Sequence, residues 1–161
     1  KMATSESGEK GNEHVILEFF SGIGGMRYAA ETWASAGSAD EQRKVEVPQA
    51  FEVSSVANTV YAHNFGDKPC NRSIEHLDVK LLDSFKADTW LMSPPCQPYT
   101  SMGLKKDSQD PRARALLHLC EVLPKLAHPP SYILLENVNN FQKSDSRDIW
   151  LAALASTGYI A

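Results

Sequence analysis

Residues 14–25 of the chain read HVILEFFSGIGG, and this stretch decides the fold. Residues 15–20 are apolar except for Glu18, and the run stops at a glycine-rich turn over residues 21–25. A short apolar run that ends in glycines indicates a buried strand followed by a sharp turn. Residues 26–36 then place apolar side chains at helical spacing, so the stretch predicts a strand, a glycine turn and a helix in succession.

The same alternation continues along the rest of the chain. Apolar runs predict further strands at residues 48–53, 89–92 and 132–135, and a short extended piece around Ile74. Helical spacing predicts helices at residues 56–64, 79–85, 116–126 and 149–154, and the charged residues 38–47 are expected to form an exposed loop. This pattern is typical of an α/β fold, a mostly parallel sheet with helices on both faces. The carboxyl ends of its strands lie at one edge, where such sheets bind ligands.

Composition narrows the class of protein. The 161 residues fit one domain over residues 14–161, and the polar residues 1–13 are expected to form a flexible tail. The net charge of -4 argues against a stand-alone nucleic-acid binder. No stretch is long and apolar enough to span a bilayer, and no secretory signal is visible. The three cysteines form no CxxC pair, so we predict no metal site and a cytoplasmic or nuclear location.

Two of the predicted strand ends carry residues suited to a ligand. Glycines in the turn over residues 21–25 let the backbone approach a carboxylate or phosphate at the start of the next helix, although such turns also serve only to reverse a chain. Glu52 follows the strand at residues 48–53, where a carboxylate can accept hydrogen bonds from both hydroxyls of a ribose. A solvated strand-end carboxylate is the simpler alternative for Glu52.

Cys96 stands in the sequence SPPCQP, residues 93–98, directly after the strand at residues 89–92. Three prolines in six residues fix the backbone, and a rigidly held, partly exposed thiol is suited to act as a nucleophile. Cys120 lies on the apolar face of a predicted helix and fits a small buried hydrophobic residue instead. Glu136 follows the strand at residues 132–135, so its carboxylate is expected at the same edge as the thiol.

The motifs together resemble those of the cytosine-5 methyltransferase family. FFSGIGG at residues 19–25, PPCQ at 94–97 and ENV at 136–138 occur in the family's order, and the combination of PPCQ with ENV is highly specific. LMSPPCQPYTSMG at residues 91–103 and FEVSSVANTVYAHNF at 51–65 are similar to the eukaryotic branch that methylates an anticodon-loop cytosine of tRNA(Asp). The resemblance implies a Rossmann-like fold that uses S-adenosylmethionine.

The resemblance also implies a role for each matching residue. Cys96 would be the nucleophile, and Glu136 would hold the cytosine ring. Glu52 would bind the ribose of S-adenosylmethionine. The other expected cofactor-binding residues are Phe20, Ile23, Gly24, Gly25, Ile74, Glu75, Ser93 and Ala115.

Three features of the family have no match in these 161 residues: a paired-arginine motif, a target-recognition region and a final helix beside the cofactor. The resemblance therefore implies a C-terminally truncated catalytic domain. We expect tRNA as the partner, with DNA as the alternative, and make no prediction of oligomeric state. A non-catalytic relative that only binds the cofactor is a second alternative. A zinc cytosine deaminase would need a second cysteine where Tyr99 stands.

Overall fold

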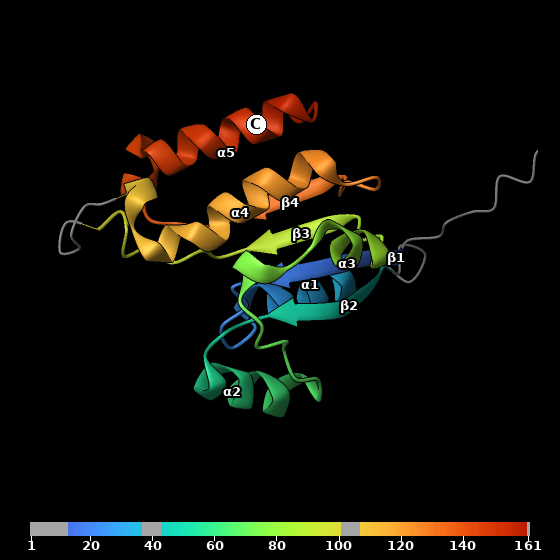
Figure 1. The fold of residues 1–161 in the computed structure, drawn as a ribbon. Helices are drawn as coiled ribbons and strands as arrows, with labels where there is room; N and C mark the ends of the chain where they lie inside the picture. Colours follow the sequence, from blue (N-terminus) through green and yellow to red (C-terminus); the bar gives the residue numbers. More distant parts are fainter. Residues whose placement is uncertain (1–12, 37–42, 101–106, 161) are drawn as a thin grey trace, which may run out of the picture.

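The computed structural model describes residues 13–36, 43–100 and 107–160 (Figure 1). Four strands form one sheet in the order β2-β1-β3-β4. Their bounds are Glu13–Phe19 for β1, Lys44–Phe51 for β2, Thr89–Met92 for β3 and Tyr132–Leu135 for β4. All three pairings are parallel, which confirms the predicted α/β fold.

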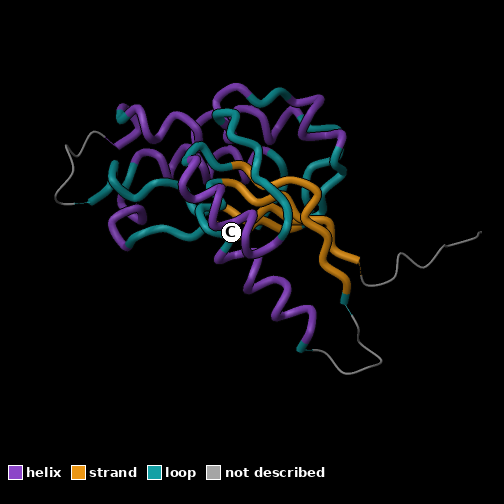
Figure 2. Tube along the Cα trace, turned by 90° about the horizontal axis from the view of Figure 1, so that it is seen from below, coloured by secondary structure: helices purple, strands orange, loops and turns teal. Residues whose placement is uncertain are grey.

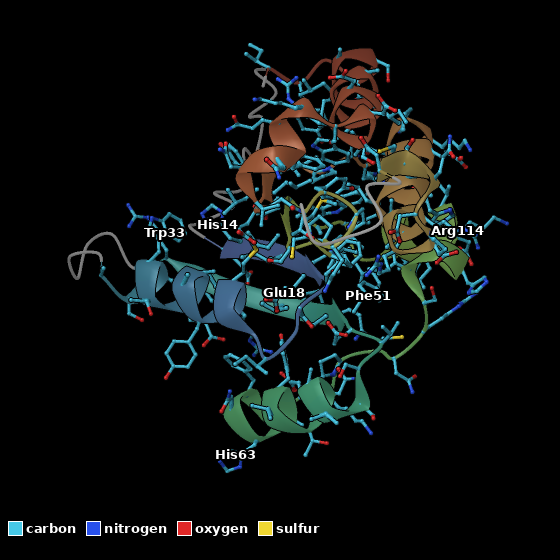
Figure 3. The ribbon with its side chains drawn as sticks, turned by 90° about the vertical axis from the view of Figure 1, so that its left-hand side faces the viewer. His14, Glu18, Trp33, Phe51, His63 and Arg114 are labelled. Atoms are coloured by element: carbon cyan, nitrogen blue, oxygen red, sulfur yellow. The ribbon has the colours of Figure 1, made fainter. Side chains whose placement is uncertain are left out.

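Within the described residues, five α-helices connect or follow the strands. They are α1 (Gly25–Ser35), α2 (Ser55–Phe65), α3 (Val79–Ser84), α4 (Arg114–Val122) and α5 (Asp145–Ser156). Figures 2 and 3 place α1 on one face of the sheet and α4 on the other, and α5 packs against α4. Within the described ranges, no helix is both long and apolar enough to cross a membrane.

The main core lies between the sheet and α4. Leu17 and Phe19 from β1 pack with Trp90 of β3 and with Leu116 and Leu119 of α4, and all five are at most 1% exposed. The Phe19 ring centroid lies 4.9 Å from that of Trp90. Burying each such side chain contributes about 1.5–3 kcal/mol, so this layer fixes the strand ends that follow it.

Glu18 lies on the opposite face of β1, because successive side chains of a strand alternate. Its carboxylate is 1% exposed and lies beneath α1 (Figure 3). It accepts hydrogen bonds from the Tyr61 hydroxyl at 3.0 Å and from the Arg27 backbone N–H at 3.2 Å. The sequence pattern marks Glu18 only as an interruption, whereas the fold uses it to hold the start of α1.

Several predicted boundaries and one predicted element were wrong. Ile74 begins a 3-10 helix, Ile74–His76, and the extended contact beside β2 is made instead by Cys70, which pairs with Phe51. The predicted loop at 38–47 overlaps β2, because Lys44 already pairs with Glu13 of β1. Residues 38–42, half of that loop, lie outside the described residues, as do residues 1–12 of the predicted tail.

The ends of α4 and α5 also differ from prediction, for local reasons. The α4 helix stops at Val122 and continues as the 3-10 helix Leu123–Lys125, because Pro124 has no backbone N–H to extend the α-helical pattern. The α5 helix begins well before residue 149, since the Ser144 hydroxyl caps it by accepting the Arg147 N–H at 3.0 Å.

Candidate active site

A cavity of about 620 Å³ lies at the carboxyl ends of the strands. Segments that follow all four strands contribute to its wall, together with the stretches around Ile74 and Arg112. Its volume is in the range of about 300–1,000 Å³ that is usual for small-molecule sites. The location agrees with the sheet edge that the sequence pattern indicated.

Eight of the eleven predicted site residues line this cavity. They are Phe20, Glu52, Ile74, Glu75, Ser93, Cys96, Ala115 and Glu136. Ile23, Gly24 and Gly25 do not, and Ile23 is 57% exposed. Of the FFSGIGG segment, residues 19–25, only Phe20 therefore lines the cavity.

Gly24 has a structural role in the turn before α1. Its φ is 92°, a left-handed conformation that favours glycine, and it caps the N-terminus of α1. A Cβ at this position would lie 2.2 Å from Cε2 of Phe65. The missing side chain thus allows close packing of the turn against α2.

Glu52 is held rigidly at the end of β2. One carboxylate oxygen accepts the Gly22 N–H at 3.0 Å, and the other accepts the Ser54 N–H at 2.8 Å. A carboxylate has about four lone-pair positions, so each oxygen can accept one more hydrogen bond. This geometry suits two neighbouring hydroxyls, as in a ribose.

Cys96 is presented by a turn that several hydrogen bonds define. Its carbonyl accepts the N–H groups of Tyr99 at 2.9 Å and Thr100 at 3.2 Å. The thiol-bearing residue is half-buried and lines the cavity. Cys120 differs on both counts, since it is buried in the core, and burial raises the pKa of its thiol to about 12. The two cysteines thus lie in different environments, Cys96 at the cavity and Cys120 in the core.

Glu136 enters the same cavity from β4. Its backbone N–H donates to the Met92 carbonyl at 2.9 Å, which extends the pairing of β3 and β4 by one step. The residue is exposed, so its carboxylate is accessible to a ligand in the cavity. Thiol and carboxylate thus line one cavity from neighbouring strand ends.

Asn137 connects the Cys96 and Glu136 segments, a role that the sequence did not predict. Its side-chain amide donates to the Pro94 carbonyl at 2.9 Å, and its own oxygen accepts the Val138 N–H at 2.8 Å. A short polar residue beside a strand end was the available signal, but its partner 43 positions away could not be identified from sequence. Arg112 was missed as well, because it belongs to none of the matched motifs.

No metal centre is found among the described residues, which contain no group of three His, Cys, Asp or Glu side chains placed to hold an ion.

Comparisons with known proteins identify the family of the chain. Residues 15–161 match the family model described as C-5 cytosine-specific DNA methylase. A DNA (cytosine-5)-methyltransferase of Dictyostelium discoideum is 44% identical over 89% of the chain, and the human tRNA (cytosine(38)-C(5))-methyltransferase is 37% identical over the same share. The solved methyltransferase EhMeth of Entamoeba histolytica gives a TM-score of 0.78, with 32% identity over 92% of the chain.

The chain spans only part of these relatives: 37% of the Dictyostelium protein, 35% of the human protein and 45% of the Entamoeba structure. The family match over residues 15–161 includes all the residues that line the cavity. The chain therefore belongs to the C-5 cytosine-specific DNA methylase family.

Proposed function

We propose that the protein transfers a methyl group from S-adenosylmethionine to carbon 5 of a cytosine in tRNA, through a covalent bond to Cys96. The observation that carries the proposal is the convergence of Cys96 and Glu136 on one cavity. The family uses S-adenosylmethionine, and Glu52 offers two acceptor positions that suit its ribose.

The thiol solves a specific chemical difficulty, because carbon 5 of cytosine is a poor nucleophile. The Cys96 thiolate adds to carbon 6, and the electron pair of the 5,6 double bond then makes carbon 5 able to attack an electrophile. Bound S-adenosylmethionine supplies the electrophilic methyl group. Loss of the carbon 5 proton to a base restores the double bond and releases the Cys96 thiolate.

Glu136 assists by holding the ring. Its carboxyl group contacts nitrogen 3 and the exocyclic amino group, and it favours protonation of nitrogen 3 as the bond to sulfur forms. Exposure of Glu136 to the cavity supports this role, since the group must meet the base directly. Asn137 holds the Cys96 and Glu136 segments in register.

The choice of tRNA rests on the relatives named for that activity, among them the human protein. A looped cytosine also costs less to extrude than a paired one. DNA is the second candidate, because the Dictyostelium relative, at 44% identity, is named as a DNA methyltransferase. A tRNA substrate would be met in the cytoplasm or the nucleus.

The test is methyl transfer from labelled S-adenosylmethionine by the protein in its full length. We expect labelling of tRNA, and we expect Cys96→Ala to abolish it while Cys70→Ser, a cysteine outside the cavity, retains it. Equal or faster labelling of duplex DNA would overturn the choice of tRNA. Labelling of neither polymer would favour a relative that binds the cofactor without catalysis.

The covalent step has its own test. An RNA with 5-fluorocytosine at the target position should remain bound to Cys96 under denaturing conditions, since the fluorine at carbon 5 cannot leave as the proton does. Mass spectrometry of the Cys96 peptide would detect this adduct. Methyl transfer to ordinary RNA without a trapped adduct would rule out the thiol mechanism.

A further inference from the structure

Arg112 is the only cationic residue on the cavity wall among the residues that the structure describes. The same wall carries three carboxylates, those of Glu52, Glu75 and Glu136. An anionic group that enters the cavity is therefore repelled by the three carboxylates and attracted by Arg112 alone among these wall residues. No sequence motif and no step of the proposed chemistry uses Arg112.

Asp110 fixes the orientation of the Arg112 guanidinium. Nε and Nη2 of Arg112 donate to the two carboxylate oxygens of Asp110 at 2.9 and 2.7 Å. The Arg112 backbone N–H donates to the same carboxylate at 2.9 Å. Asp110 is 2% exposed, so its buried carboxylate holds the guanidinium in a fixed position. A side-on pair of this kind limits the rotation of the planar group.

The outer edge of the guanidinium remains available for a ligand. The pair with Asp110 uses Nε and Nη2, and none of the hydrogen bonds within the described part of the chain uses Nη1. The Arg112 side chain is 45% exposed although its partner is buried. Arginine commonly binds phosphate through such N–H groups.

The guanidinium also lies near the thiol. The pKa of Arg112 is raised, chiefly by the hydrogen bond to Asp110, and the negative charge of a Cys96 thiolate adds to this. Arg112 and Cys96 line the same cavity, which places the cation and the nucleophile at one site. A nucleotide whose base reaches Cys96 carries a phosphate within a few bonds of that base.

We propose that Arg112 binds the backbone phosphate of the nucleotide whose cytosine reacts with Cys96. The proposal rests on the function proposed above, and it makes the substrate a nucleotide in a chain rather than a free base or nucleoside. Arg112 then supplies affinity and places the sugar, while Cys96 and Glu136 act on the base.

Alkylation of Cys96 tests the anion preference without any methyl transfer. Iodoacetate and iodoacetamide react with the same thiolate, but only iodoacetate is an anion. The ratio of their rates therefore reports attraction of an anion to the site and is independent of the fraction of thiolate. Mass spectrometry of the Cys96 peptide measures both rates on the 161-residue chain.

We expect Arg112→Gln to lower the iodoacetate-to-iodoacetamide ratio about two- to fivefold, as loss of a nearby charge in water predicts. Arg112→Lys keeps the charge and should keep most of the ratio. The matched control is Arg114→Gln, which removes an arginine two positions away that is exposed on α4 outside the cavity wall (Figure 3). Circular dichroism checks that each variant is folded.

An unchanged ratio in folded Arg112→Gln would overturn the proposal, and so would an equal loss in Arg114→Gln. If Arg112→Gln does not fold, Arg112→Lys and added inorganic phosphate decide the matter. Phosphate should slow alkylation of Cys96 by iodoacetate more than by iodoacetamide, and equal slowing of the two would contradict the assignment.

The full-length enzyme gives the second readout. We expect Arg112→Gln to raise KM for the RNA more than it lowers kcat. Replacing the phosphate beside the target cytosine by a neutral methylphosphonate should weaken the parent enzyme but have little further effect on Arg112→Gln. Equal effects in both enzymes would show that Arg112 does not contact that phosphate. Absence of all methyl transfer would instead contradict the proposed function, and the alkylation ratio would still be measurable.

Discussion

At the scale of single residues, Glu18 is the most unusual side chain of the chain's interior. Tyr61 donates to it at 3.0 Å, and the Arg27 guanidinium donates to the Tyr61 hydroxyl at 3.3 Å. The same guanidinium lies 4.5 Å from the centroid of the Phe65 ring. Burial raises the pKa of Glu18 above its usual value of 4.5, and the hydrogen bonds from Tyr61 and Arg27 offset part of this. Glu18 therefore links the stability of the turn below α1 to pH.

The sign of this linkage can be tested with Glu18→Gln. Because the folded chain keeps a proton that the unfolded chain releases, the contribution of Glu18 to stability is present below pH 4.5 and declines as pH rises through the raised pKa. We expect the unfolding free energy of the parent, relative to Glu18→Gln, to decrease from pH 4.5 toward neutrality. Urea titrations at several pH values measure it. A difference that grows with pH would contradict the assigned direction.

At the scale of elements, Gly24 and Gly25 differ in whether the fold tolerates a side chain, and the sequence cannot distinguish them. Gly24 has a φ of 92° and lies against Phe65, whereas a Cβ on Gly25 would meet no atom within 4 Å. Both glycines stand in one motif, and both were predicted to approach the cofactor. The packing of α1 against α2 requires only Gly24.

Alanine at each glycine should therefore have opposite effects. We expect Gly24→Ala to lower the unfolding free energy by about 2–4 kcal/mol, from backbone strain and overlap with Phe65. Gly25→Ala at the first position of α1 should raise it by about 0.4–1 kcal/mol, because alanine restricts the unfolded chain. Urea unfolding monitored by circular dichroism measures both. Similar losses of unfolding free energy in the two variants would show that Gly24 and Gly25 have the same role.

The start of α5 depends on a residue distant in sequence. The Asp107 carboxylate accepts the backbone N–H groups of Asp145 at 2.7 Å and Ser146 at 3.1 Å, and also the Ser146 hydroxyl at 2.8 Å. Negative charge at a helix N-terminus is further favoured by the helix dipole. Asp107 thereby ties the segment before Arg112 to α5.

We expect Asp107→Ala to lower the unfolding free energy by about 1–3 kcal/mol, since two backbone donors lose their acceptor. The control is Asp148→Ala in the first turn of the same helix, where the 74% exposed carboxylate contacts Arg147. This control should change stability by less than about 0.5 kcal/mol. Equal effects would mean that only the charge near the helix start matters.

At the scale of the whole molecule, the β4 side of the sheet has an apolar surface. Tyr132 is 65% exposed and Leu134 is 57% exposed. No strand within the described residues pairs with the outer edge of β4. An exposed apolar edge strand promotes association between chains.

We therefore expect the 161-residue chain to self-associate at high concentration, and Leu134→Thr to weaken this about fivefold, from about 1 kcal/mol of lost apolar burial. Threonine retains the β propensity of the strand. Val56→Thr is the control, because Val56 is 75% exposed but lies on α2. Sedimentation velocity over a range of concentrations measures the association of the parent chain and of both variants. A monomer at every concentration would contradict the prediction.

Elements were predicted correctly from the sequence wherever the local pattern and the overall topology agree. Apolar runs located β3 and β4 to the residue, and the parallel order then placed Glu52, Cys96 and Glu136 at one edge. Contacts that join segments distant in the sequence were not predicted. The burial of Glu18 depends on Tyr61, 43 positions away, and the wall position of Arg112 depends on how the segment after Cys96 returns to the sheet. Such pairings leave no periodic signal in the chain.

The amide of Asn137 has a mechanical consequence for the site. One hydrogen bond to the Pro94 carbonyl ties the turn beyond β3 to the turn beyond β4. Displacement of either turn is thus transmitted to the other, and the separation between sulfur and carboxyl group varies less than the position of either one. A base bound to both the Cys96 sulfur and the Glu136 carboxyl group would therefore move together with the two turns as one rigid unit.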